Sequence, residues 1–196
     1  MDDPDCTVSC AQIEDTPALL RLEQKYFDSY WHSDQTLIQQ LIKQEPMMFR
    51  VCKADDRVKG YYWVVPLQYE EWKQVLTGEM DEDEMMDHIC SFTAEEIYLY
   101  ICSVIVDQSD VRRKSYTRAL VRDLARHFVQ PNSEYARDIN AIGAFTISEG
   151  GQRLMERSRF TYKGSFQAYQ GKKVRAYATR RQNLIQQVRE KRKKAV

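Results

Sequence analysis

The sequence predicts an α/β fold, more narrowly α+β, in which helices flank a mixed, mostly antiparallel central sheet. Residues 97–106 are apolar at nearly every position, which is typical of a central strand buried on both faces. Patterns with the period of amphipathic helices lie on both sides of this run. A chain of 196 residues that is 43% hydrophobic is long enough to bury one core. We therefore expect one domain over 1–179 and a basic helix or tail over 180–196.

Two helices, a hairpin and a further short helix are predicted before the central strand. Thr16 can cap the first helix, and Pro17 suits its first turn. Two runs rich in Val, Phe, Tyr and Trp are separated by Asp55-Asp56, a pattern that predicts a β-hairpin. The expected bounds are 17–26 and 33–44 for the helices, 47–54 and 57–67 for the strands, and 69–76 for a further short helix.

Four elements are predicted after the central strand. A polar link over 107–110 leads into a helix whose apolar side chains form one stripe. The dipeptide Gln170-Gly171 separates two later strand patterns and indicates a hairpin turn. The expected bounds are 115–128 for a helix, 139–147 for a strand, 149–157 for a helix, and 160–169 with 173–179 for the hairpin, before a helical tail.

Charge is unevenly distributed although the formal net charge is zero. Between Glu70 and Glu96 ten acidic side chains stand against one lysine, whereas residues 171–196 carry ten Lys or Arg against the single Glu190. We interpret residues 78–95 as an exposed acidic insertion. We interpret each charged segment as a solvated face, and a binding role is the alternative for both.

The composition also predicts where the protein functions. No apolar run reaches the roughly 18–20 residues that a membrane helix needs, and the first five residues are acidic where a signal peptide is basic. Five scattered cysteines form neither a CxxC motif nor a metal-ligand pattern with histidine. We therefore expect a cytoplasmic protein with free thiols, no metal and no membrane contact.

A basic segment follows the polar link after the predicted central strand. It reads Arg112-Arg113-Lys114-Ser115-Tyr116-Thr117, at the start of the next helix, where free backbone N–H groups and the helix dipole favour an anion such as a pyrophosphate. This segment and the order of elements over residues 7–179 resemble the GNAT family of N-acyltransferases, whose motif here is Gln/Arg-x-x-Gly-x-Gly/Ala. Ser115 and Thr117 stand at the two glycine positions.

The GNAT resemblance implies a splayed central strand and a bound acyl-CoA, such as acetyl-CoA. The cofactor-binding residues it implies are Val104, Ile105, Val106, Arg112, Arg113, Lys114, Ser115, Tyr116 and Thr117. The family also carries Leu-Tyr-x-x-x-Gly-Phe, in which the tyrosine protonates the departing thiolate. Here residues 154–160 keep the Leu and Phe, but Met155 replaces the tyrosine and Arg159 the glycine.

Four side chains are candidates for moving the amine proton during acyl transfer. Glu96, at the start of the central strand, is a candidate base, and the alternative is a water held by Tyr98 or Tyr100 on one face of that strand. His32 lies between the first two helices, a region that the resemblance places beside the acceptor pocket. The expected acceptor is an amine-bearing small molecule or protein.

Two other functions are compatible with the sequence. The missing glycines and tyrosine suit a GNAT-like protein that binds or regulates without catalysing. The basic tail suits nucleic-acid binding, which counterion release would make strongly salt-dependent. A homodimer is permitted and not required.

Overall fold

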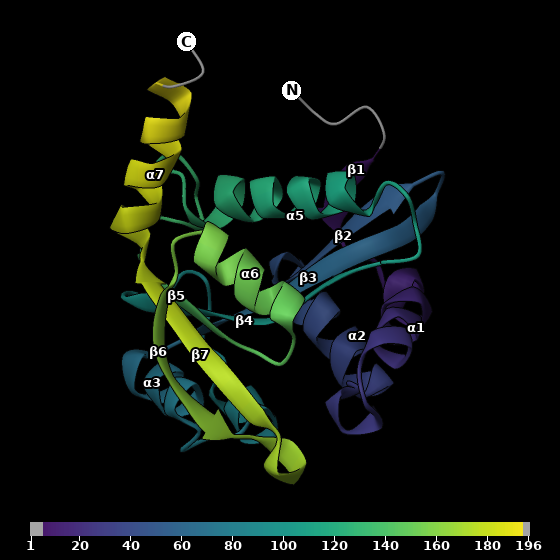
Figure 1. The fold of residues 1–196 in the computed structure, drawn as a ribbon, viewed down its shortest axis with the longest axis horizontal. Helices are drawn as coiled ribbons and strands as arrows, with labels where there is room; N and C mark the ends of the chain where they lie inside the picture. The colour runs from purple at the N-terminus through teal and green to yellow at the C-terminus, as the bar shows by residue number, and fades with distance from the viewer. Residues whose placement is uncertain (1–5, 194–196) are drawn as a thin grey trace. The chain divides into compact units, whose positions relative to one another are not determined.

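The computed structural model describes residues 6–193, which form two compact units. Of the described residues, the first comprises those up to Val64 with Ser103–Leu124, and the second comprises Val65–Cys102 with those from Ala125 onward. Figure 1 shows the elements of both units, which we describe one at a time. No helix within the described range has the length and apolar character needed to cross a membrane.

The strands form a mixed sheet in the order β1-β2-β3-β4-β5-β7-β6. Strands β4 and β5 pair in parallel, whereas β1–β2, β2–β3, β5–β7 and β6–β7 pair antiparallel. This arrangement confirms the predicted fold class. The strand bounds are Thr7–Cys10, Phe49–Ala54, Arg57–Leu67, Ile97–Val106, Ile139–Thr146, Thr161–Gln167 and Lys173–Arg180 for β1 to β7 in chain order.

The first unit packs helices α1 (Thr16–Tyr26) and α2 (Gln35–Gln44) against each other. It also contains most of α5 (Arg113–Phe128), which follows β4. Strands β1, β2 and the first part of β3 lie side by side (Figure 1). The large, fully buried side chains of its core include Leu19, Ile38, Phe49, Tyr61, Tyr62 and Tyr116.

A buried ion pair joins α5 to the sheet within the first unit. The guanidinium of Arg50 on β2 donates from Nε and Nη2 to the two carboxylate oxygens of Asp123, each at 2.9 Å. The hydroxyl of Tyr62 on β3 donates to the same carboxylate at 2.8 Å. Because both charged side chains are more than 90% buried, this network fixes the position of α5.

The second unit contains five helices in the described range: α3 (Tyr69–Thr77), α4 (Glu82–Met85), α6 (Glu149–Arg157), α7 (Arg181–Lys193) and the last residues of α5. Helix α3 packs on β5, β6 and β7, and α7 continues from the end of β7 (Figure 1). Gly143 of β5 allows the close approach of α3, because a Cβ there would lie 2.6 Å from Leu76 Cδ1.

Most predicted bounds agree with the structure within two residues, and β4 agrees at both ends. The predicted strand over 47–54 was wrong at its start, because the buried Met47 and Met48 form a 3-10 turn before β2. The expectation of an exposed acidic insertion was wrong for Met80, Met85 and Phe92, which are buried in the second unit. Helix α4 forms inside this segment.

The C-terminal tail is helical from Arg181, and its Leu184 is buried, as the apolar stripe predicts. The expectation that residues 191–194 stay solvated concerns side chains that lie outside the described part of the chain. The acidic residues 1–5 also lie outside it.

Candidate functional site

The end of β4 and the start of α5 form one candidate site in the first unit. The pairing of β4 with β5 ends at Tyr100, which lies opposite Gly143. The remainder of β4 is not paired with β5. Ser103 and Val104 are partly exposed, whereas Ile105 and Val106 are buried. At Ile105 and Val106, therefore, only the backbone can offer hydrogen bonds to a ligand.

The loop after β4 is attached to helix α1 through Asp107. Its carboxylate accepts hydrogen bonds from Lys25 Nζ at 2.8 Å and from the Tyr26 hydroxyl at 2.7 Å. The Tyr26 hydroxyl in turn accepts from the Gln108 backbone N–H at 2.8 Å. The Lys25 hydrogen bond, followed by that of Tyr26, holds the pKa of Asp107 well below its ordinary value.

Replacing Asp107 with Asn should make the free energy of unfolding depend less on acid pH than it does in the wild type. A carboxyl whose pKa is depressed in the folded protein contributes stability above its unfolded pKa, near 4, and loses it as the pH falls through the folded value. Because Asp107 lies near the surface, we expect a cost of about 1 kcal/mol at pH 7 and a smaller cost at pH 3, measured by urea unfolding. An equal cost at both pH values would contradict the stabilising role of the ionised Asp107 carboxylate.

A second carboxylate, Asp110, lies at the beginning of α5. It accepts from the backbone N–H of Arg112 at 2.8 Å and from the Tyr116 hydroxyl at 3.2 Å, and Lys59 Nζ lies 3.0 Å away. The Arg112 N–H, followed by Lys59, lowers the pKa of Asp110. The start of α5 thus already holds one internal anion, an arrangement that the helix dipole favours.

The predicted cofactor-binding residues divide into paired and open groups. Arg112 is paired, with its Nη2 2.9 Å from Asp55 Oδ2 and its Nε 3.8 Å from Asp110 Oδ1. Tyr116 is buried, and the Thr117 hydroxyl donates to the carbonyl of Arg113 at 2.9 Å. Arg113 and Lys114 have exposed side chains at the first turn of α5, and Arg113 Nη1 donates to the carbonyl of Asp110 at 3.5 Å.

A second candidate site lies in the second unit around Tyr100. This side chain is fully buried, and its hydroxyl donates to Glu82 Oε1 at 2.8 Å. Burial, followed by the nearby Glu82 charge, raises the pKa of Tyr100 well above its ordinary value. Burial and Glu82 also raise the pKa of the Cys102 thiol. The acidic segment therefore places a carboxylate where the β4–β5 pairing ends.

The other two predicted catalytic residues each have their own local surroundings. Glu96 precedes β4, is exposed and has a backbone φ of 58°, and among the described residues its carboxylate has no hydrogen-bond or ion-pair partner. His32 belongs to the first unit, where its Nε2 lies 3.0 Å from the carbonyl oxygen of Phe27. Tyr100 is thus paired with Glu82, and not with Glu96.

Two site residues escaped the sequence prediction, Glu82 and Asp110. Asp110 accepts from the backbone N–H two residues on, a local contact that Asp commonly makes in turns, so this signal was available in the sequence. For Glu82 the sequence offers only its membership of an acidic run, because its partner on β4 is distant along the chain. No group of metal-binding side chains gathers within residues 6–193.

Comparison with solved structures shows a GNAT-like fold. The loading GNATL domain of CurA from Lyngbya majuscula has a TM-score of 0.71 at 13% identity, covering 91% of this chain and 98% of that domain. The GphF GNAT-like decarboxylase in complex with isobutyryl-CoA has a TM-score of 0.66 at 12% identity, with coverages of 89% and 99%.

A third structure with this fold is Arabidopsis thaliana Naa50 in complex with the bisubstrate analogue CoA-Ac-MVNAL. Its TM-score is 0.56 at 9% identity, covering 89% of this chain and 98% of Naa50. No protein-family model matches the sequence, and no curated protein matches it significantly. At these identities the likeness shows the fold, which confirms the GNAT resemblance at that level.

Proposed function

We propose that the protein is an acyl-CoA-dependent N-acyltransferase that transfers an acyl group to an amine. The observation that carries the proposal is the course of β4, which leaves its pairing with β5 at Tyr100 and leads into the cationic first turn of α5. Two proteins of the same fold, GphF and Naa50, are solved with ligands that contain CoA. These complexes support acyl-CoA as the co-substrate.

The pyrophosphate is assigned to the first turn of α5. Arg113 and Lys114 supply charge, and the helix dipole favours an anion at this end. Ser115 and Thr117 narrow the backbone approach that glycine would leave open, and the Thr117 hydroxyl already donates to the Arg113 carbonyl. The carboxylate of Asp110 repels a second anion, so the exposed cations must compensate for it.

The acyl group is assigned to β4 beyond Tyr100. Backbone N–H groups over Cys102–Val106 can donate to the thioester carbonyl as it becomes an oxyanion. The amine nitrogen attacks the carbonyl carbon, the C–S bond breaks, and CoA leaves as a thiol after taking a proton from water. Met155 has no proton to give at the position of the family's tyrosine.

The amine proton is assigned to the Glu82 carboxylate, which Tyr100 orients by its hydrogen bond. Tyr100 itself is unsuited to be a base, because its raised pKa keeps it protonated. Glu96 and His32 remain alternative bases in this proposal. The exposed acidic side chains beside Glu82, such as Asp81 and Asp83, favour a cationic acceptor.

Replacing both Arg113 and Lys114 with Ala should weaken CoA binding about 10- to 100-fold, because two charge-assisted phosphate contacts are lost. Isothermal titration with acetyl-CoA and with CoA measures this. The matched control is Arg118→Ala, which removes an exposed cation of the same helix beyond its first turn. Equal affinities in all three proteins would overturn the pyrophosphate assignment, and no binding to the wild type at millimolar concentration would overturn the proposed function.

A second candidate function is CoA binding without catalysis. Met155 favours it, because methionine stands at the position of the family's tyrosine and cannot protonate the departing thiolate. The assay follows thiol release with a panel of primary amines. A protein that binds acetyl-CoA but acylates none of these amines would favour this second function over the first.

A further inference from the structure

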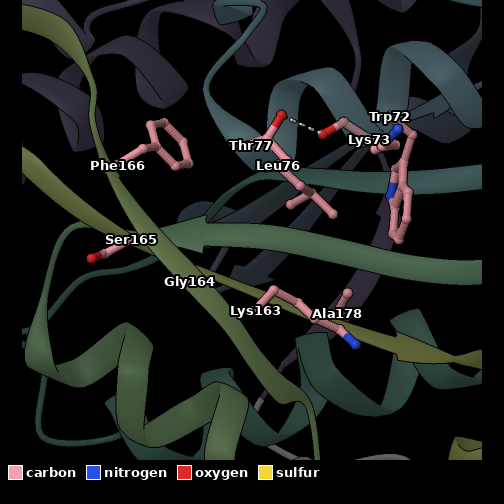
Figure 2. A pocket seen from close by; sticks show the side chains of 9 residues that line it. All are labelled: Trp72, Lys73, Leu76, Thr77, Lys163, Gly164, Ser165, Phe166 and Ala178. Carbon is pink, nitrogen blue, oxygen red and sulfur yellow. Dashed lines mark hydrogen bonds between the residues drawn. The ribbon is translucent and has the colours of Figure 1, made fainter.

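The second unit contains a largely apolar hollow of about 360 Å³ between α3 and the strands β6 and β7. Figure 2 shows Trp72 and Leu76 of α3 with Phe166 of β6 around it, and the Lys163 amine pointing away from Phe166. The Trp72 indole N–H donates to the Leu99 carbonyl at 3.1 Å, so this ring offers the hollow only apolar surface. An apolar group is therefore the natural occupant of this space.

A larger hollow of about 690 Å³ adjoins the first, because Trp72, Lys163 and Ala178 line both. Its described lining includes four cationic side chains and no carboxylate. These cations are Arg137, Lys163, Arg180 and Arg181. Together the adjoining hollows form a trough with an apolar end and a cationic end, and volumes of this order are usual for small-molecule sites.

Arg181 in the lining of the larger hollow also favours an anionic ligand. This side chain is held by its Nε, which donates to the Val129 carbonyl at 3.1 Å. Burial lowers the pKa of Arg181, an effect that the carboxylate of Asp138 opposes. A ligand anion beside the four cations would offset this desolvation.

We propose that this trough binds an organic carboxylate with an apolar body. The body lies in the smaller hollow against Trp72, Leu76 and Phe166, and the carboxylate lies in the larger one against Arg180, Arg181 and Lys163. The exposed ring of Tyr69 and that of Tyr98, with centroids 5.1 Å apart, extend the apolar wall beside the cations. This site lies wholly in the second unit and is independent of the proposed acyltransferase function.

The test is a calorimetric titration of the full chain with octanoate, octanamide and acetate. Octanoate should bind, whereas octanamide lacks the charge and acetate lacks the body, so each should bind about tenfold more weakly or worse. Octanoate and octanamide binding equally would overturn the anion site, and octanoate and acetate binding equally would overturn the apolar end.

Variants locate the binding. Arg180→Gln and Lys163→Gln should each weaken octanoate binding about tenfold, and Phe166→Ala should weaken it similarly without affecting acetate. The matched control is Arg175→Gln, an exposed arginine of β7 that does not belong to either lining, and it should bind as the wild type does.

Circular dichroism and thermal unfolding check that each variant folds. Octanoate binding that survives Arg180→Gln and Lys163→Gln but is lost in the Arg113→Ala/Lys114→Ala protein would overturn the proposal, since the carboxylate would then bind at the α5 loop. Failure of acetyl-CoA binding alone would leave these results unchanged.

Discussion

Replacing Asp123 with Ala should lower the free energy of unfolding by about 3–5 kcal/mol, the cost typical of breaking a buried ion pair from one side. The substitution leaves the Arg50 guanidinium buried without its two carboxylate bonds, and it removes the acceptor of the Tyr62 hydroxyl. Burial alone would lower the pKa of Arg50, but hydrogen bonds and charge from Asp123 raise it above its ordinary value. Urea unfolding followed by circular dichroism measures the loss.

The control for Asp123 is an exposed ion pair. Arg153 lies 3.2 Å from Glu149 one helical turn away on α6, and Arg153→Ala should cost less than about 0.5 kcal/mol. Replacing both buried partners, as Arg50→Met with Asp123→Leu, should recover much of the loss because no unpaired charge remains. A cost for Asp123→Ala as small as that of the control would show that the network contributes little.

This network also bears on the candidate site. Asp123 belongs to the same helix whose first turn carries Arg113 and Lys114, so the ion pair holds the helix that presents them. We expect Asp123→Asn, which keeps the shape and removes the charge, to destabilise the protein less than Asp123→Ala.

The sequence predicts those elements whose signal is local. Strand β4 was bounded correctly because nearly every residue from Ile97 to Val106 is apolar, and the β2–β3 turn because Asp55-Asp56 interrupts two strand patterns. The start of β2 was placed too early because Met47 and Met48 are apolar and buried, and apolar character alone does not distinguish a 3-10 turn from a strand.

The side-chain networks are the part that the sequence does not predict. The Arg50–Asp123 pair joins residues 73 positions apart, and Tyr100 reaches its carboxylate across a segment that looked only like a solvated acidic run. Their pairing depends on how strands and helices pack, so no spacing rule reveals it. The cations of Arg113 and Lys114 were predicted as a group because they are adjacent and begin a helix, whereas the pairing of Arg112 with Asp55 needed the structure.

Replacing Glu82 with Gln should reduce kcat for amine acylation on the order of 100-fold, with the KM for acetyl-CoA near its wild-type value. The amide keeps the size of the side chain and can still accept from Tyr100, but it cannot take the proton that the amine must lose. Steady-state kinetics that follow thiol release measure the rate as a function of pH. In the wild type the rate should rise as the base ionises, and in Glu82→Gln this rise should be absent.

Three further variants separate proton transfer from the structural role of Glu82. Asp83→Asn removes a neighbouring exposed carboxylate of α4, so it should leave kcat near its wild-type value and affect only the KM for a cationic amine. Tyr100→Phe keeps the buried ring but loses the hydrogen bond that orients Glu82, so its kcat should fall less than that of Glu82→Gln, with the pH dependence retained. Glu82→Asp should recover part of the activity. If Glu82→Gln turns over normally while His32→Ala or Glu96→Gln does not, the base is one of those residues and the role proposed for Glu82 is wrong.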